Sequence, residues 1–184
     1  MKSWFRGFNI YLLMLALGLG TGCQTTDDPS PPGANKKKEF CLLRFFIETN
    51  PDATGRNQIV PIFRENPSPV CVEKIPVLTE ADIEQVSLLD QVGGFAILVQ
   101  FNDHGTRLLE MTTASHPSQR LAVFAQYSIK SKTVETRWLA APRITHRIAN
   151  GAFVFTPDAT REQADRIVEG MTHLLAEAKQ KDTF

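Results

Sequence analysis

Residues 99–106 read Val-Gln-Phe-Asn-Asp-His-Gly-Thr, and this stretch decides where a strand gives way to a helix. It closes the run 95–101, which is apolar at nearly every position, as in a central strand covered on both faces. Gly105, Leu108, Leu109 and Thr112 then follow at the spacing of one helix face. The stretch therefore predicts a buried strand that leads into an amphipathic helix ending near residue 114.

The same stretch places an acid beside a histidine, which allows two interpretations. Asp103 and His104 would form half of a catalytic site, or the segment would simply begin the helix. Asn102 and Asp103 are both favoured N-cap types, and an acid in the first turn interacts favourably with the positive helix end. Gly105 on the inward face would let the helix approach the sheet closely, with His104 facing solvent. We favour the capping interpretation.

The rest of the chain predicts more strands and a second helix. Strands are expected at 40–48, 58–63, 70–75, 121–127, 134–139 and 151–155, and 121–127 should pair with 134–139 across the polar turn 130–132. Thr79 and Asp82 form a capping box that predicts the start of a helix in a region ended by Gly93-Gly94. A further capping box at 160–163 precedes an apolar stripe at Ala164, Ile167, Val168, Met171, Leu174, Leu175 and Ala178. Together these elements predict an α+β fold, a mostly antiparallel sheet with two main helices packed on one face.

The N-terminus has the three parts of an export signal. Lys2 and Arg6 precede an apolar centre at 10–19, and a small-residue end leads to Cys23. That centre is about half the ~20 residues needed to span a bilayer as a helix. Gly22-Cys23 resembles a bacterial lipobox, although Gly20 and Thr21 depart from its usual pattern, and the resemblance implies that Cys23 is lipidated and begins the mature protein. An ordinary cleaved signal peptide is the alternative, and it would leave Cys23 as an unexplained free thiol.

The segment after Cys23 has the composition of a tether. Residues 24–38, QTTDDPSPPGANKKK, are polar and Pro-rich, and as a coil would span roughly 20 Å. The predicted organisation is a signal peptide at 1–22, a lipidated cysteine and linker at 23–38, and one domain at 39–184. A lipid anchor places this domain at a membrane surface facing the periplasm. Gln24 directly after the cysteine favours the outer membrane over the inner one.

Export also changes how the two remaining cysteines are interpreted. Cys41 and Cys71 lie in strand-like runs and form an even pair in an oxidising compartment. A disulfide closing this roughly 30-residue loop would stabilise the fold by roughly 3–4 kcal/mol. The alternative is two buried free thiols that behave as small hydrophobes. We favour the disulfide.

Composition and motifs exclude several functional classes. The chain has 20 basic and 20 acidic residues and no long positive stripe, so nucleic acid is not a predicted partner. It contains no G-x-S-x-G, GxxxxGK[ST] or GxGxxG motif. The four histidines, His104, His116, His146 and His173, have no metal-ligand spacing. The sequence therefore predicts no catalytic residue, metal or cofactor.

Several landmarks of the chain fall in an order that resembles the periplasmic head subdomain of SecD, the accessory subunit of the Sec translocon. The similarity covers roughly residues 76–178. The residues that carry it are Phe101, Asn102, Asp103, Gly105, Thr112, Leu121, Ala122, Pro142, Ile144, Ile148 and Gly151. The resemblance implies a structural role for these residues and a SecD-head-like fold. It does not extend to SecD's transmembrane helices or proton-conducting acidic site.

The leading hypothesis is therefore a lipid-anchored cell-envelope protein whose domain is not an enzyme. The resemblance implies that it binds exported or unfolded polypeptides, or another envelope protein. Tyr127 and Trp138 are candidate contact residues near the predicted hairpin, because aromatic side chains are common interface anchors; core packing is the alternative for Trp138. An envelope hydrolase with an unrecognised His/Asp site and a purely structural envelope protein are the other hypotheses.

Overall fold

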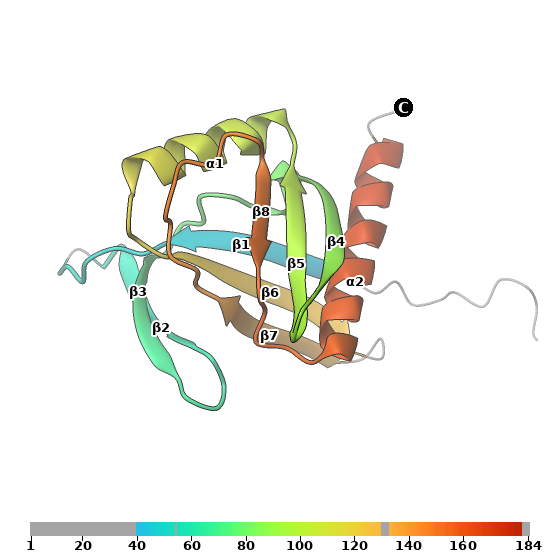
Figure 1. Cartoon of the computed structure of the whole chain (residues 1–184), viewed down its shortest axis with the longest axis horizontal. Coiled ribbons are helices and arrows are strands. Elements are labelled where there is room, and N and C mark those ends of the chain that lie inside the picture. Colours follow the sequence, from blue (N-terminus) through green and yellow to red (C-terminus); the bar gives the residue numbers. More distant parts are fainter. Residues whose placement is uncertain (1–39, 54, 130–132, 182–184) are drawn as a thin grey trace, which may run out of the picture. The chain divides into compact units, whose positions relative to one another are not determined.

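The computed structural model describes residues 40–53, 55–129 and 133–181 (Figure 1). The predicted signal peptide, Cys23 and linker lie outside these ranges, as does the turn 130–132. The elements, in chain order, are β1 (Cys41–Ile47), β2 (Asn57–Ile62), β3 (Ser68–Glu73), the 3-10 turn η1 (Glu80–Asp82), β4 (Ile83–Gln91), β5 (Gly94–Phe101), α1 (Asp103–Ser115), β6 (Leu121–Ile129), β7 (Thr133–Ala140), β8 (Ala152–Phe155) and α2 (Arg161–Lys181).

Three antiparallel sheets make up the strand framework. Their strand orders are β1-β6-β7, β2-β3 and β4-β5-β8. The α+β class, the mostly antiparallel pairing and the two helices are confirmed. The β6–β7 hairpin also forms as predicted, with Ser128 opposite Val134. The strands β4, β5 and β8 run across those of the β1-β6-β7 sheet in Figure 1.

The main core lies where these two larger sheets face each other and meet α2. Phe45 of β1 contacts Phe101 of β5 and Phe153 of β8 edge to face, with ring centroids 5.2 and 5.8 Å apart. Ile167 and Met171 of the predicted α2 stripe are completely buried in the same cluster. The expected coverage of β5 on both faces is only partly found, because Val99 and Phe101 are buried in this core whereas Leu98, on the other face, is half-buried.

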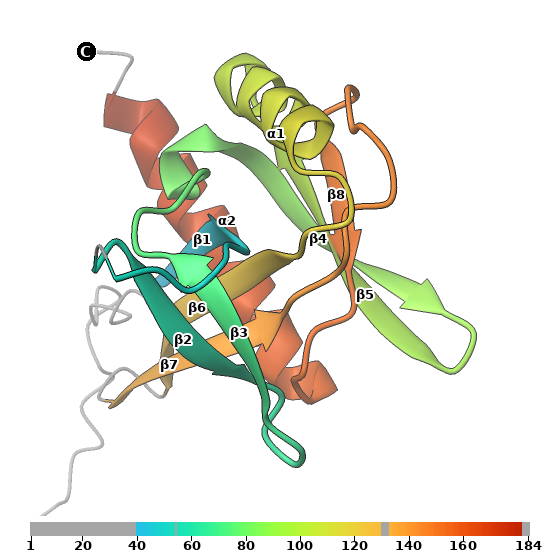
Figure 2. The same ribbon diagram turned by 90° about the vertical axis from the view of Figure 1, so that its left-hand side faces the viewer.

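A smaller core occupies the opposite face of the β1-β6-β7 sheet. The β2–β3 hairpin covers this face (Figure 2), and Val60, Ile62, Val70 and Val72 of the hairpin pack against Phe46 and Ala122. Proline is tolerated in this hairpin because each strand of a two-stranded sheet is an edge strand, which needs no N–H donor on its unpaired side. Pro61 of β2 lies opposite Pro69 of β3.

The helix expected after Thr79 is a single 3-10 turn, so this prediction is wrong. The capping box itself is present, with the Thr79 N–H and hydroxyl donating to Asp82 at 2.8 and 3.0 Å. The chain then continues as β4, in which Ile83 and Val86 are buried. A bulge between Ile83 and Gln85 shifts the strand register there, so that Val86 faces the core as Ile83 does. Pairing along the whole length of β5 outweighs the local helix signal.

The predicted disulfide is also wrong, since Cys41 and Cys71 are both free. Cys41 begins β1, whereas Cys71 is next to Val72, which bridges Glu48 beyond the other end of that strand. Seven residues of extended strand correspond to roughly 23 Å, far beyond the reach of a disulfide. Cys41 is instead completely buried where Gly170 brings α2 close to β1. Burial, with a contribution from the Glu80 carboxylate, raises the pKa of the Cys41 thiol above its usual range.

Candidate functional site

The segment 99–106 forms a tightly packed junction between β5 and α1. The Asn102 side chain accepts a hydrogen bond from the Gly105 N–H at 2.9 Å and donates one to the Ala81 carbonyl at 3.0 Å. Asn102 is therefore the N-cap of α1, and it also ties the helix start to η1. Asp103 is exposed in the first turn, where its charge faces the positive helix end. The capping interpretation of this segment is confirmed.

His104 does pair with an acid, but the acid is Asp82. The His104 Nδ1 lies 2.8 Å from Asp82 Oδ1, and the other carboxylate oxygen accepts both hydrogen bonds from Thr79. Asp82 is only 8% exposed, whereas the His104 side chain is 67% exposed, as its predicted solvent-facing position requires. The sequence contained half of this signal, because the capping box at Thr79 already fixed where the Asp82 carboxylate lies.

This arrangement differs from a hydrolytic triad. The carboxylate lies between the hydroxyl of Thr79 and His104, whereas a triad requires the imidazole between acid and nucleophile. In a triad, the imidazole removes the proton from the nucleophile. Here the hydroxyl donates to the carboxylate, so His104 is not positioned as its base. The geometry therefore gives no support to the hydrolase hypothesis.

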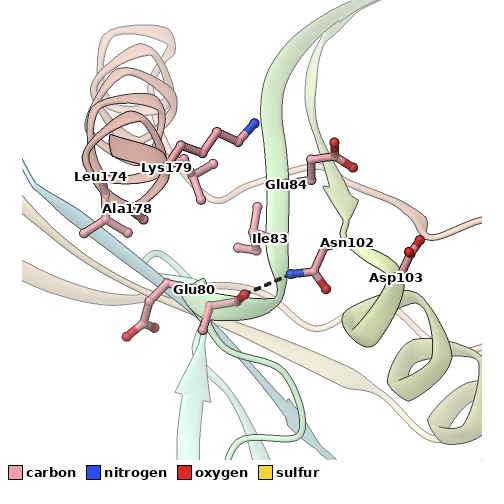
Figure 3. A pocket seen from close by; sticks show the side chains of 10 residues that line it. Glu80, Ile83, Glu84, Asn102, Asp103, Leu174, Ala178 and Lys179 are labelled. Carbon is pink, nitrogen blue, oxygen red and sulfur yellow. Dashed lines mark hydrogen bonds between the residues drawn. The ribbon is translucent and has the colours of Figure 1, made fainter. Parts of the chain in front are cut away.

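A groove of about 580 Å³ lies beside the junction, between the start of β4 and the C-terminal part of α2 (Figure 3). Its floor is apolar, formed by Ile83 and Leu174, and the carboxylates of Glu84 and Asp103 stand on one side. Glu80, which also lines the groove, forms an ion pair with Arg44, with 3.2 Å between the charged atoms. These groups can bind side chains by contact and charge, and the described lining of the groove includes no serine, threonine or cysteine.

Two glycines of the family-like set permit close packing around the junction. A Cβ atom at Gly105 would stand 2.6 Å from the Asp82 carbonyl oxygen, so only glycine fits under that backbone. Gly151 has a φ of +69°, and a Cβ there would stand 2.2 Å from the Thr106 hydroxyl oxygen. These contacts confirm the close approach predicted for Gly105. They also give Gly151 a structural role in holding β8 near α1.

The other family-like residues hold the segment between β7 and β8 against α1 and β6. Ile144 is buried and exchanges backbone hydrogen bonds with Ser118 and Gln119, while the Pro142 carbonyl accepts from the Leu121 N–H at 2.9 Å. Phe101, Leu121 and Ala122 are buried core residues, and Ile148 is partly buried against the main core.

The buried threonine of α1 is one position later than expected. Thr112 is half-buried, whereas Thr113 is 2% exposed and its hydroxyl donates to the Leu109 carbonyl at 2.8 Å. The same hydroxyl accepts a hydrogen bond from the Ile148 N–H at 3.0 Å. Thr113 therefore fastens the β7–β8 segment to α1. The ambiguity arose because two consecutive threonines fit the helical spacing almost equally well.

Tyr127 is 1% exposed, so the prediction that it is a surface contact is wrong. Its position in β6 faces the main core, opposite Glu135 of β7. Burial raises the pKa of Tyr127, with a further contribution from Glu135. Trp138 is half-buried and packs edge to face against Phe46 and Phe124, each at 5.1 Å, as its core-packing alternative requires.

Sequence reasoning missed Arg137, which is 9% exposed and joins the hairpin to the start of α2. Its guanidinium donates to Glu135 at 3.2 Å and to Gln163 at 3.0 Å, and also to the Asp158 carbonyl. Gln163 is the reciprocal residue of the predicted capping box, with its side chain 3.0 Å from the Thr160 N–H. A charged residue in a β-strand gives no sequence signal for such burial.

Two wider features bear on function. The described residues contain no cluster of three or more histidine, cysteine or acidic side chains arranged to hold a metal ion. No helix within the same ranges combines the length and the apolar character needed to cross a membrane.

Comparison with known proteins gives a family and a fold. The model of the family "SecDF, P1 head subdomain" matches residues 57–171. No curated protein matches the sequence. A solved structure described as the membrane component SecDF that enhances protein export is similar with a TM-score of 0.51 and 19% identity, over 78% of this chain and 71% of the other. The solved structure of SecDF in its super-membrane-facing form is similar with a TM-score of 0.50 and 19% identity, over 74% of this chain and 19% of the other.

Proposed function

Because the chain belongs to the SecDF P1 head subdomain family, we propose that it is a lipid-anchored protein of the cell envelope that binds exported or unfolded polypeptides. The family match over residues 57–171 is the observation that carries this proposal. It indicates a role associated with protein translocation rather than catalysis. An envelope protein partner recognised by the same domain is the broader form of the proposal.

The anchor is proposed from the N-terminal sequence. Cys23 follows an export signal and carries the lipid, and residues 24–38 form the tether for a domain that begins at residue 39. The domain then faces the periplasm, with the outer membrane favoured by Gln24. Two or three acyl chains make such attachment stable, since each buried CH₂ contributes about 0.8 kcal/mol.

The anchor is tested by metabolic labelling with radioactive palmitate and by membrane fractionation. The wild-type chain should take up label and sediment with membranes, whereas Cys23→Ser should do neither. Cys71→Ser is the matched control, because it removes a cysteine without touching the proposed anchor. A wild-type chain that takes up no label would exclude this anchor and leave the cleaved signal peptide as the explanation, whereas equal labelling of the wild type and Cys23→Ser would place the lipid on another residue.

Polypeptide binding is tested with the full lipidated chain in a mild detergent. The probe is a reduced, carboxymethylated protein that remains unfolded, and its folded, disulfide-intact form is the control. The proposal expects saturable binding of the unfolded form alone, together with crosslinks to exported chains in intact cells. Failure of the purified chain to bind the unfolded probe would reject this function.

A further inference from the structure

We propose that the free edge of β8 and the two hollows beside it bind an extended polypeptide segment that carries apolar and acidic side chains. The inference rests on the proposed polypeptide-binding function and specifies its site and its mode. β8 ends the strand order β4-β5-β8, so one of its edges has no strand partner among the described residues. An extended peptide can add to such an edge through main-chain hydrogen bonds, in the way that PDZ domains bind their ligands.

The hydrogen-bond pattern of β8 shows which backbone groups face outward. The Phe101 N–H donates to the Gly151 carbonyl at 2.9 Å, which fixes one bonded pair of the antiparallel ladder. Bonded and non-bonded pairs alternate along such a ladder. Phe153 and Phe155, two and four residues further on, therefore direct their backbone groups toward β5.

Ala152 and Val154 consequently direct their backbone groups away from β5. The Ala152 N–H is already satisfied, because it donates to the Asn150 side chain at 3.1 Å. The carbonyl of Ala152 and both backbone groups of Val154 are left for an incoming strand. An added strand can form two hydrogen bonds with Val154 and a third with Ala152, which sets its register.

Two hollows share Val154, which is 44% exposed. The first hollow, of about 570 Å³, lies between β8 and the segment 142–150, which runs alongside β8 in Figure 1. The second, of about 720 Å³, lies between β8, the end of β7 and Phe63, with Ala141 and Pro142 in its wall. Side chains of an added strand would therefore meet apolar surface on both sides of Val154.

Phe63 adds an independent observation at the second hollow. It is 50% exposed and has a φ of +69°, a backbone conformation that bulky residues rarely adopt. The conformation is held by the neighbouring Arg64 N–H, which donates to the Asp158 carboxylate at 2.9 Å. Strained residues of this kind concentrate at binding sites. Here the strain presents an aromatic side chain at the rim of the hollow.

The charges around β8 define the occupant further. Arg143, His146 and Arg147 line the first hollow, and its described lining residues include no carboxylate. Arg147 forms an ion pair with Glu110 yet remains 63% exposed at its side chain. In the second hollow the carboxylate of Asp158 is engaged by Arg64 and Arg137. The free charge along the groove is therefore positive, which favours an acidic segment.

The same charges argue against a second copy of this chain as the occupant. Pairing of β8 with another β8 would bring two cationic hollows, each with Arg143 and Arg147, against one another. Like charges placed opposite each other at an interface disfavour association. An unfolded chain with an acidic stretch has no such penalty.

The test measures fluorescence anisotropy of the full lipidated chain in detergent with a fluorescein-labelled peptide. The peptide alternates valine and threonine and carries two glutamates at one end. Val154→Pro removes the outward N–H without removing a bond to β5, and edge strands tolerate such a proline. Val154→Thr is the matched control, because it keeps the N–H. Val154→Pro should weaken binding at least about tenfold, the effect of one lost hydrogen bond near 1.4 kcal/mol, and Val154→Thr by less than about threefold.

Changes in the peptide keep the test independent of the folding of any variant. N-methylation at alternate peptide positions blocks the pairing edge, and replacing the glutamates with lysines reverses the charge; both should weaken binding at least about tenfold. If the wild type binds the unfolded protein but Val154→Pro and the methylated peptide bind as before, the β8 site is wrong while the polypeptide-binding function stands. If the wild type binds neither probe, the function itself fails. A dimer of the wild type, seen by analytical ultracentrifugation and lost in Val154→Pro, would assign the edge to a second copy.

Discussion

The β5–α1 junction and the free edge of β8 belong to the same sheet, yet the polar groups are hydrogen-bonded at the junction, whereas those at the edge have no strand partner among the described residues. At the junction, the cap of Asn102 and the carboxylate of Asp82 are fully engaged by local donors and acceptors. At the edge, the backbone groups of Val154 face outward beside an exposed valine side chain. The junction has no room for one methyl group at Gly105, whereas hollows open on either side of Val154.

This contrast separates residues that maintain the fold from residues available for binding. Buried polar groups are costly when unpaired, so a closed hydrogen-bond set indicates a structural role. Unpaired backbone groups at an exposed edge remain hydrated and available for a partner strand. The acid–histidine pair near residue 104 therefore belongs to the fold, although its composition resembles part of an active site.

The largest expected effect is at Gly105. Gly105→Ala should lower the free energy of unfolding by about 3 kcal/mol, because its methyl group meets the Asp82 backbone carbonyl and outweighs the better helix propensity of alanine. Chemical denaturation monitored by circular dichroism measures the change. Gly94→Ala is the matched control, since a Cβ at Gly94 has nothing within 4 Å, and should change stability by less than about 0.5 kcal/mol. Equal effects of the two substitutions would refute the tight junction.

The helix cap provides the next largest effect. Asn102→Ala removes the acceptor of the Gly105 N–H and the donor to Ala81, and should cost about 1–2 kcal/mol. Asp103→Ala, one residue later, removes an exposed charge at the helix start and should cost about 0.5 kcal/mol at low salt. Added salt should abolish the second effect and leave the first. A larger loss for Asp103 than for Asn102 would reassign the cap.

The sequence predicted this junction well because its determinants are local. A cap residue, a glycine and an apolar run lie within residues 95–109, and each acts on its neighbours in the chain. The helix predicted after Thr79 failed for the opposite reason. Its capping box is present, but the following residues are recruited as β4 by pairing with β5, and this tertiary contact outweighs the local signal. The register that buries Tyr127 likewise depends on partners from distant parts of the chain.

The cysteine pair and the β8 edge show that sequence patterns also fail to predict which distant elements become neighbours at a candidate functional site. Cys41 and Cys71 lie in strands as predicted, but which strands are neighbours depends on the sheet order, which places them at distant points. The hollow beside β8 unites Phe63 with residues near 141 and 154, and no spacing in the sequence relates these three. Sites assembled from separate elements are therefore the part that pattern reasoning does not reach.

Tyr127 lies in β6, outside the β5–α1 junction, and differs from the polar groups of that junction in having no hydrogen-bond partner among the residues that the structure describes. Its hydroxyl is buried and makes no hydrogen bond of ordinary geometry within the described residues. Tyr127→Phe should therefore change stability at pH 7 by less than about 1 kcal/mol. Because burial raises the pKa of Tyr127 in the folded state, its contribution is complete below the unfolded pKa of about 10 and is lost as the pH rises through the folded value. The wild type should lose more stability than Tyr127→Phe between pH 9 and 11, and identical alkaline profiles would contradict this.

The smallest expected effect is at the β8 edge, where the same substitution can be compared across adjacent strands. Val154→Thr should change the free energy of unfolding by less than about 0.5 kcal/mol, since the residue is 44% exposed and a hydroxyl there remains hydrated. Val99→Thr in β5 places the same hydroxyl at a completely buried position and should cost about 2 kcal/mol. Urea denaturation of both variants gives the comparison directly. If Val154→Thr cost as much as Val99→Thr, the edge would be part of the packed fold and unavailable to a partner strand.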